Sequence, residues 1–315
     1  MTLDRPLFGI ALMIGFCVTA LLIDVFSKLA TTSVPVAMIT AARFVVQGAV
    51  MLPVALLLGH RLWLSRDLFP ALVLRALCVT GSTFSFVSAV QVMPIADALA
   101  IAFVEPFIIL LWGRFVMGEP VGTRRLVASL VGFAGVLLVI QPSFERFGPV
   151  AFWPLGTAFS FAFYILVTRR LSARMHPVPM QMHTSWLAVL ICVPAIALVD
   201  SPAFDTTVPQ GIAWIWLVGV GLASAVSHML MTFALRAAPS TLLAPLHYLE
   251  LVSAVTLGYL IWGDFPNPVA WVGIGIVIGS GLYIIHREQV AARLRASAAP
   301  PAARPPPAPA PHGAG

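Results

Sequence analysis

Hydrophobic residues along this chain gather into runs of about 20, and the short segments between the runs carry most of its arginine. A run of this length predicts a helix that crosses the roughly 30 Å hydrocarbon core of a bilayer. The pattern therefore predicts an all-α integral membrane protein with ten transmembrane helices. The predicted spans are residues 8–27, 35–58, 69–90, 96–117, 123–140, 149–169, 179–199, 211–235, 241–262 and 266–286.

The second half of the chain repeats the first half at an offset of 145 positions. The match has no gap and aligns Pro94 with Pro239, Glu105 with Glu250, and Gly118-Glu119 with Gly263-Asp264. A weaker match at an offset of 142 pairs the first span with the sixth. The sequence predicts two repeats of five spans, residues 1–142 and 143–286. An Ala- and Pro-rich stretch at 287–315 is expected to be a disordered cytoplasmic tail.

Positive charge is distributed as an inverted repeat requires. An odd number of spans per repeat reverses the second copy in the membrane, and short cytoplasmic loops retain Lys and Arg. Of the 18 Lys and Arg residues, fourteen fall in segments that share a side with the N-terminus. Lys28 and Arg146 fall on the other side, and Arg43 and Arg75 fall within spans. Both termini are therefore predicted to be cytoplasmic.

Composition excludes several other classes of protein. Hydrophobic residues make up 60% of the chain and charged residues 10%, which leaves too little polar surface for a soluble particle of 315 residues. The net charge of +6 comes from spacers between spans rather than from one face, so no nucleic-acid partner is expected. The sequence has no metal-ligand spacing and no phosphate or dinucleotide motif, so neither a metal nor a cofactor is predicted.

Three ionisable residues within the predicted spans are candidates for a substrate site. A charge inside hydrocarbon costs a few kcal/mol and needs a partner or a water-filled cavity. Arg43, Arg75 and Glu105 can line a central cavity and bind a polar substrate there. They can instead form a purely structural tie between Glu105 and one of the arginines. Both interpretations remain open from the sequence.

Two further groups of residues allow a functional and a structural interpretation. His228, His247 and Glu250 can carry a proton during transport, because histidine titrates near neutrality, or can form a hydrogen-bonded core cluster. Asp24 and Lys28 lie one helical turn apart and can form an outer gate or a solvated helix end.

Aromatic and small residues add predictions about ligand stacking and helix packing. Phe84 and Phe103 can stack on a planar ligand or serve in packing. Small residues spaced by four in spans 123–140 and 266–286 predict close helix contacts, either within the chain or in a homodimer. Pro106 follows Glu105 directly and predicts a bend in its span.

Four stretches together carry a resemblance to a known family. They are GEPVGTRRLVASLVGFAGVLLVIQP at 118–142, MPIADALAIAFVEPF at 93–107, IDVFSKL at 23–29 and ARF at 42–44. With two five-span halves, this combination resembles an EamA-type member of the drug/metabolite transporter superfamily over about residues 7–287. Glu105 departs from the family pattern, in which a small residue precedes the proline.

The resemblance implies a multi-pass carrier of the cell inner membrane that works by alternating access. The substrates it implies are S-adenosylmethionine, riboflavin, amino acids and related metabolites. From the residues alone, two rival classes are an integral-membrane enzyme with an amphipathic substrate and a non-transporting membrane partner. The ionisable residues are isolated and deep rather than clustered at an interface. The sequence therefore favours a secondary transporter, not an enzyme.

Overall fold

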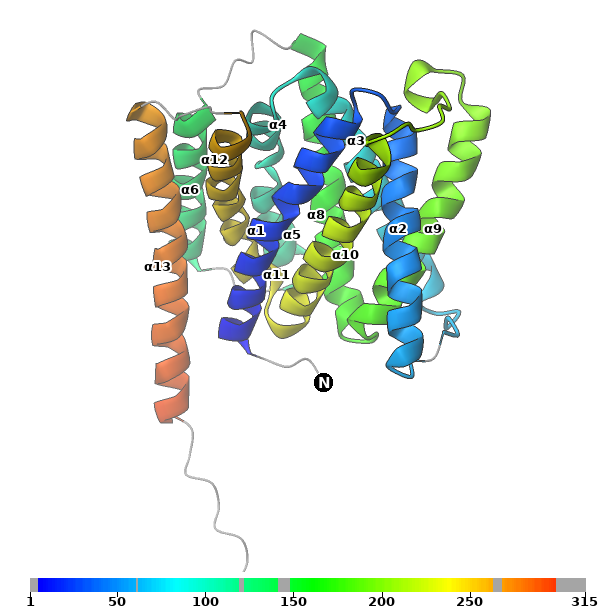
Figure 1. Ribbon diagram of the computed structural model, residues 1–315. Coiled ribbons are helices and arrows are strands. Elements are labelled where there is room, and N and C mark those ends of the chain that lie inside the picture. The colour runs from blue at the N-terminus through cyan, green and yellow to red at the C-terminus, as the bar shows by residue number, and fades with distance from the viewer. Residues whose placement is uncertain (1–4, 61, 119–121, 141–147, 263–267, 299–315) are drawn as a thin grey trace, which may run out of the picture.

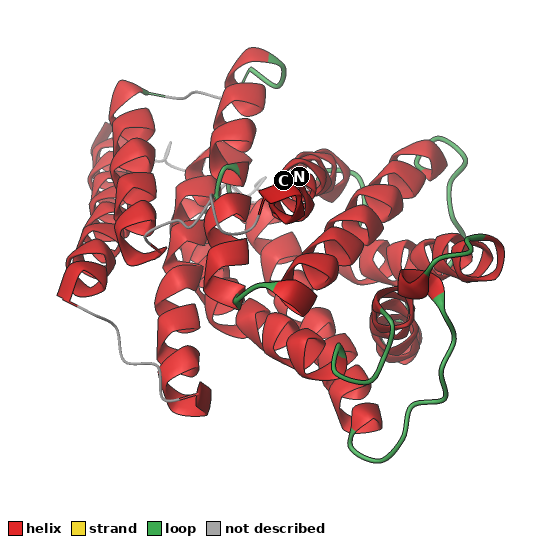
Figure 2. Cartoon of the chain, turned by 90° about the horizontal axis from the view of Figure 1, so that it is seen from above, coloured by secondary structure: helices red, strands yellow, loops and turns green. Residues whose placement is uncertain are grey.

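The computed structural model describes residues 5–60, 62–118, 122–140, 148–262 and 268–298, and this part of the chain is helical with no strand (Figures 1 and 2). The predicted turns at Gly118-Glu119 and Gly263-Asp264 lie largely outside the described residues. The elements are α1 (Pro6–Ala30), α2 (Val36–Leu57), α3 (Phe69–Val92), α4 (Ile95–Ala102), α5 (Glu105–Phe115), α6 (Thr123–Ile140), η1 (Gly148–Ala151), α8 (Phe152–Ser172), α9 (Pro177–Leu198), η2 (Pro202–Phe204), α10 (Ala213–Ala237), α11 (Ser240–Leu243), η3 (Ala244–Leu249), α12 (Glu250–Trp262) and α13 (Pro268–Ala298).

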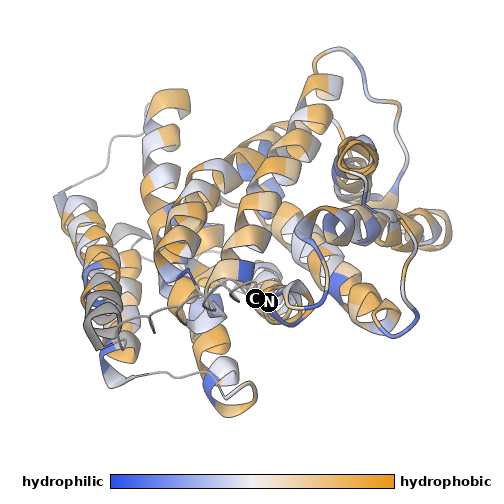
Figure 3. Ribbon diagram, turned by 90° about the horizontal axis from the view of Figure 1, so that it is seen from below, coloured by the Kyte–Doolittle hydropathy of each residue, from blue (hydrophilic) through white to orange (hydrophobic). Residues whose placement is uncertain are grey.

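Seven helical segments within the described residues are long and apolar enough to cross a membrane. They are α1, α2, α3, η1 with α8, α9, α10, and the segment from α11 into α12. Shorter apolar helical stretches cover residues 126–138 and 271–287. Hydrophobic residues dominate the helices when the molecule is seen from below (Figure 3), and large apolar side chains such as Leu190 and Leu198 face outward. The chain is a multi-pass membrane protein.

Two of the predicted spans are broken helices. In residues 95–115, α4 ends at Ala102 and α5 begins at Glu105, so the break comes just before Pro106. Proline is well accommodated in the first turn of a helix, where its missing N–H leaves no hydrogen bond unmade. In residues 240–262, the 3-10 turns of η3 separate α11 from α12, which begins at Glu250. Both breaks therefore place an acidic residue at the start of the second helical piece.

The two halves of the chain interlock. The most extensive contacts join α1 to α10, α3 to α8, α2 to α9, and α6 to α13. The sequence match makes α1 equivalent to α8 and α3 equivalent to α10, so the α1–α10 pair corresponds to the α8–α3 pair. Neighbours α6 and α13 run in opposite directions, upward and downward in Figure 1.

Close packing between α6 and α13 uses the predicted small residues within the chain. A Cβ atom on Gly132 would lie 2.7 Å from the Tyr248 ring and 2.8 Å from the Ser280 hydroxyl. Gly135 approaches the backbone of α13 as closely, because a Cβ atom there would lie 2.9 Å from the carbonyl oxygen of Gly273. Gly279 has open space beside it instead. The glycines of α6 thus serve an intramolecular contact.

One end of the molecule contains the start of α1 and the connections α2–α3, α8–α9 and α10–α11. We call it the arginine-rich end. The backbone N–H of Arg5 donates to the carbonyl oxygen of Ala237. Arg174 pairs with Asp67, and the rings of His60 and His176 lie 4.3 Å apart between centroids. The start of α1 and the end of α13 both lie at the lower end in Figure 1.

Helix α13 continues beyond the end expected for the last span. The sequence predicted a disordered tail from Arg287 onward, whereas the helix continues to Ala298. Residues 287–298 include four alanines and three arginines, which are good helix formers and account for the extension. The rest of the predicted tail lies outside the described residues.

Candidate functional site

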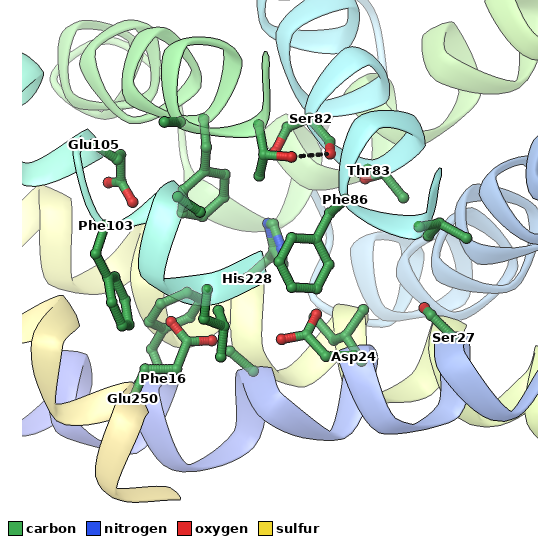
Figure 4. A pocket seen from close by; sticks show the side chains of 18 of the residues that line it. Phe16, Asp24, Ser27, Ser82, Thr83, Phe86, Phe103, Glu105, His228 and Glu250 are labelled. Carbon is green, nitrogen blue, oxygen red and sulfur yellow. Dashed lines mark hydrogen bonds between the residues drawn. The ribbon is translucent and has the colours of Figure 1, made fainter. Parts of the chain in front are cut away.

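A cavity lies between the two halves of the chain, and its volume of about 690 Å³ includes space that is open to the surroundings. Its lining comes from α1, α2, α3, α8 and α10 and from the two broken helices (Figure 4). The polar lining consists of Asp24, Ser27, Arg43, Ser82, Thr83, Glu105, Thr157, His228 and Glu250, and the aromatic lining consists of Phe16, Phe86, Phe103 and Phe161. A pocket with apolar walls and a few convergent polar groups is typical of a small-molecule site.

Three carboxylates reach this cavity from three helices. Asp24 comes from the last third of α1, and Glu105 and Glu250 come from the breaks in the two interrupted helices (Figure 4). The two glutamates are 5% and 8% exposed, so little water outside the cavity reaches them. One arginine, Arg43, shares the lining. The cavity can therefore bind both a cationic and an anionic group of a ligand, and its acidic residues outnumber its one arginine.

Arg43 is held by neutral partners rather than by an acid. Its guanidinium donates to the Thr83 hydroxyl at 2.5 Å and to the Nε2 atom of His228 at 2.6 Å. The Nε atom of Arg43 is buried and has no hydrogen-bond partner in the structure. An unsatisfied buried donor beside a cavity is expensive unless a ligand or water completes it.

Glu105 contacts a histidine from the other half of the chain. The Nδ1 atom of His247 lies 3.3 Å from both carboxylate oxygens of Glu105, and both side chains are buried. The structural tie that the sequence allowed between Glu105 and Arg43 or Arg75 is not formed in the described structure. His247 also lies against Phe16, with 5.5 Å between ring centroids.

Arg75 lies apart from the cavity, in a buried polar cluster. It is 0% exposed and donates to the hydroxyls of Thr168 at 2.8 Å, Thr184 at 2.5 Å and Tyr164 at 2.8 Å. Its guanidinium carbon also stands 4.5 Å from the Tyr164 ring centroid. Of the sequence-predicted binding residues, the structure brings Arg43, Glu105 and Phe103 to the cavity, whereas Arg75 reaches it only through intermediaries.

Two other predicted residues also point elsewhere. Phe84 stacks on Phe204 with 5.1 Å between ring centroids and lies outside the cavity lining. Lys28 donates to the carbonyl oxygen of Met93 at 3.0 Å instead of pairing with Asp24. The i,i+4 spacing places the two residues on one side of α1, but Asp24 lines the cavity and Lys28 bonds to the residue that follows α3.

Sequence analysis missed several residues that the structure assigns to the site or to its surroundings. Phe16, Phe161 and the small hydroxyl residues line the cavity, and Tyr164 and Gln181 surround Arg75. Tyr164 and Gln181 each interrupt an apolar span, which was the available signal. The aromatic lining gave no signal, because phenylalanine is common in all these spans. Within the described residues, no group of His, Cys, Asp or Glu is arranged to hold a metal ion.

Comparison with known proteins places the chain in a class. The family model described as "EamA-like transporter family" matches residues 7–141 and again residues 148–286. The chain therefore belongs to the EamA-like transporter family, within the drug/metabolite transporter superfamily. This membership agrees with a transporter rather than an enzyme.

Individual relatives are similar over most of their length. A riboflavin transporter of Vibrio cholerae is 27% identical over 81% of this chain and 84% of its own. An S-adenosylmethionine uptake transporter of Rickettsia bellii is 26% identical over 85% of this chain and 90% of its own. A riboflavin transporter of Rhizobium johnstonii is 29% identical over 65% of this chain and 66% of its own.

The fold also occurs among solved structures. One crystal structure superposes with a TM-score of 0.71 at 21% sequence identity and covers 89% of this chain and 97% of its own. At this level of identity the likeness concerns the fold alone.

Proposed function

We propose that this protein is a secondary transporter that moves a small zwitterionic or polar organic metabolite across the cell inner membrane by alternating access. The observation that carries the proposal is the cavity between the two halves of the chain, which is lined by Arg43, three carboxylates and four phenylalanines. The names of the relatives, which transport riboflavin or S-adenosylmethionine, support an organic substrate with an aromatic or heterocyclic part.

The lining suggests how such a substrate is held. The guanidinium of Arg43 can bind an anionic group, and the carboxylates of Asp24 and Glu250 can bind a cationic group. The phenylalanines provide faces for an organic ring. Because acids outnumber the arginine, a ligand that carries a positive charge is favoured over one that is only anionic.

Alternating access is supported by the position of the cavity along the helix axes. The lining residues of α1 run from Phe16 to Ser27 of a helix that ends at Ala30, and those of α8 lie near its start. The cavity therefore occupies the half of the protein away from the arginine-rich end. The side toward the arginine-rich end is closed by Arg75 and its partners. We propose that the two inverted repeats move against each other, so that the cavity opens in turn toward one side of the membrane and toward the other.

Proton coupling is the less direct part of the proposal. We assign it to Glu105 with His247 and to Glu250, because these groups lie at the helix breaks beside the cavity. His228 is less suited to carry a proton, because its Nε2 atom already accepts from Arg43. Lys28 remains a candidate for an outer gate through its bond to Met93.

The topology that accompanies this function is ten transmembrane helices in two inverted repeats, residues 1–142 and 143–286, with both termini cytoplasmic. The opposed directions of α6 and α13 support it. A homodimer is a further proposal, with the open side of Gly279 on α13 as its contact. Measuring the mass of the protein in lipid nanodiscs tests the dimer.

Binding is tested by the thermal stability of the purified protein with riboflavin and, separately, with S-adenosylmethionine. A ligand raises stability in proportion to the logarithm of its concentration above its dissociation constant. We expect Arg43→Gln and Glu105→Gln each to weaken binding at least about 10-fold, since hydrogen bonds to charged groups contribute about 1.5–3 kcal/mol. The matched control is Arg174→Gln, at an exposed ion pair far from the cavity. Affinities that stay unchanged in both cavity variants would overturn the site.

A further inference from the structure

A continuous chain of hydrogen bonds joins the cavity to the closed half of the protein. It begins at Arg43, which donates to Nε2 of His228 at 2.6 Å. The other ring nitrogen of His228, Nδ1, lies 2.8 Å from the Tyr164 hydroxyl, and Arg75 donates to that same hydroxyl at 2.8 Å. All four side chains are buried, and they come from α2, α10, α8 and α3. We call these four residues the arginine relay.

The chemistry of the two arginines fixes the direction of these bonds. A guanidinium has no lone pair to offer, so Nε2 of His228 must accept from Arg43 and carries no proton. The imidazole is therefore neutral, with its proton on Nδ1 and donated to Tyr164. The Tyr164 hydroxyl accepts from His228 and from Arg75 together. Loss of either bond of His228 leaves a buried ring nitrogen unpaired, and loss of the bond from Arg75 removes one of the two donors to the Tyr164 hydroxyl, so each residue is coupled to the next.

The far end of the arginine relay closes the half of the protein toward the arginine-rich end. Arg75 binds Thr168 of α8 and also Gln181 and Thr184 of α9, so one side chain links α3 to two helices. One turn further toward the arginine-rich end, an apolar layer fills the space between the same three helices. Its buried members are Leu72, Leu171 and Met180.

The other half has no equivalent polar closure in the described structure. The stretch of α10 that corresponds to the surroundings of Arg75 is residues 217–220, and it contains only apolar residues and glycine. Leu217 and Val220 belong to an apolar cluster with Ile39 and Val87. The two closures therefore differ in chemistry although the repeats share a fold, and among the described residues only the closure around Arg75 is joined to Arg43 of the cavity by hydrogen bonds.

We propose that the arginine relay makes closure of the arginine-rich half depend on whether the cavity is occupied, with His228 and Tyr164 as the positioning residues that connect them. The proposal rests on the proposed transport function but concerns its coupling rather than its substrate. When an anionic group binds Arg43, the guanidinium turns toward it and withdraws its bond from His228. His228 and Tyr164 are then free to move, and the contacts of Arg75 with α8 and α9 weaken. The same guanidinium thus affects both the occupied cavity and the closure around Arg75. Energetic coupling between two regions requires such a shared element.

The test measures how often the apolar layer opens, and it needs no ligand. Met180→Cys is placed in a background in which Cys17, Cys78 and Cys192 are replaced by alanine, and its rate of labelling by a small maleimide is followed in nanodiscs. Tyr164→Phe removes the hydroxyl that links His228 to Arg75 but keeps the ring beneath the Arg75 guanidinium. We expect labelling to become at least about fivefold faster in this variant, because an interaction worth about 1 kcal/mol is lost.

Tyr248→Phe provides the matched control. Tyr248 is as buried as Tyr164, and its hydroxyl lies 3.5 Å from Ser129, outside the arginine relay. Equal labelling rates in Tyr164→Phe and Tyr248→Phe would overturn the proposal. His228→Gln serves as a second cut in the relay if Tyr164→Phe does not fold, and the same acceleration is expected. Since labelling is measured without substrate, failure of riboflavin or S-adenosylmethionine to bind leaves this result interpretable.

Discussion

Glu105 and Glu250, 145 positions apart in the chain, each begin the second piece of a broken helix and face the same cavity. Their environments nevertheless differ. Glu105 lies 3.3 Å from Nδ1 of His247, while Glu250 faces the cavity with Asp24 nearby on α1 (Figure 4). Equivalent positions of the two repeats thus differ, because one carboxylate lies against a histidine and the other faces the cavity. This difference makes Glu250 the better candidate for reversible protonation.

Glu250→Gln is expected to separate proton coupling from substrate exchange. The amide keeps the size and hydrogen-bonding capacity of the carboxyl group but cannot bind or release a proton. Uptake driven by a pH gradient in proteoliposomes should be lost, while counterflow exchange at equal pH should remain. The experiment uses whichever of riboflavin and S-adenosylmethionine the protein binds. A variant that keeps pH-driven uptake would remove Glu250 from the coupling mechanism.

The proposed inverted topology predicts opposite accessibility for two equivalent helix starts. Thr123 begins α6 and Pro268 begins α13, again 145 positions apart. Cysteines introduced at Thr123 and at Val269 should react with impermeant maleimide from opposite sides of the membrane. Cysteines at Leu62, near the arginine-rich end, and at Val208, in the exposed loop after η2, serve as references for the two sides. Labelling of Thr123→Cys and Val269→Cys from one side would rule out the inversion.

Close packing of α6 on α13 predicts unequal effects of two glycine substitutions. Gly132→Ala would place a methyl group 2.7 Å from the Tyr248 ring, and overpacking of this kind costs about 1–3 kcal/mol. Gly279→Ala has no atom within 4 Å of the new methyl group, and alanine favours a helix over glycine by about 1 kcal/mol. The melting temperature in detergent should fall for the first and hold or rise for the second. Equal losses would show that the Gly132 contact is not tight.

The histidine pair at the arginine-rich end predicts a pH dependence of stability. Burial, with His60 and Arg236 adding to it, lowers the pKa of His176, and its ring also accepts a hydrogen bond from the backbone of Val178 at the start of α9. A lowered histidine pKa means that the unfolded chain binds the proton more readily than the folded one. The neutral ring's contribution is therefore intact above the unfolded pKa of about 6.5 and is lost as the pH falls below it.

His176→Asn should reduce this pH dependence, because asparagine keeps a capping acceptor and does not titrate. The measurement compares the melting temperatures of both proteins between pH 5 and pH 8. As the pH falls, the melting temperature of the variant should decrease less than the melting temperature of the unmodified protein. His286→Asn, at an exposed position in the second half of α13, is the control for general effects of removing a histidine. A constant difference between the two melting temperatures across this range would contradict the role given to His176.

The sequence by itself determined the class of protein, because a bilayer leaves few solutions for an apolar chain. Runs of about 20 apolar residues must become helices, since nothing else satisfies their backbone hydrogen bonds in lipid. The offset of 145 positions and the uneven placement of arginine then indicated two opposed halves. The isolated ionisable residues within the spans were also visible, because each one contrasts with an apolar background.

Only the tertiary structure decided which of these residues share a site. Arg43, Arg75 and Glu105 look equivalent in the sequence, but Arg75 lies in its own cluster with Tyr164, and Glu105 pairs with His247 from the other repeat. Helical periodicity gives the face of a residue within one helix but not the helix that packs on that face. Partners such as His228 for Arg43 lie 185 positions away, and their meeting depends on how the two halves interlock. The cavity and the arginine relay therefore arise from packing between the two repeats, which local sequence patterns do not predict.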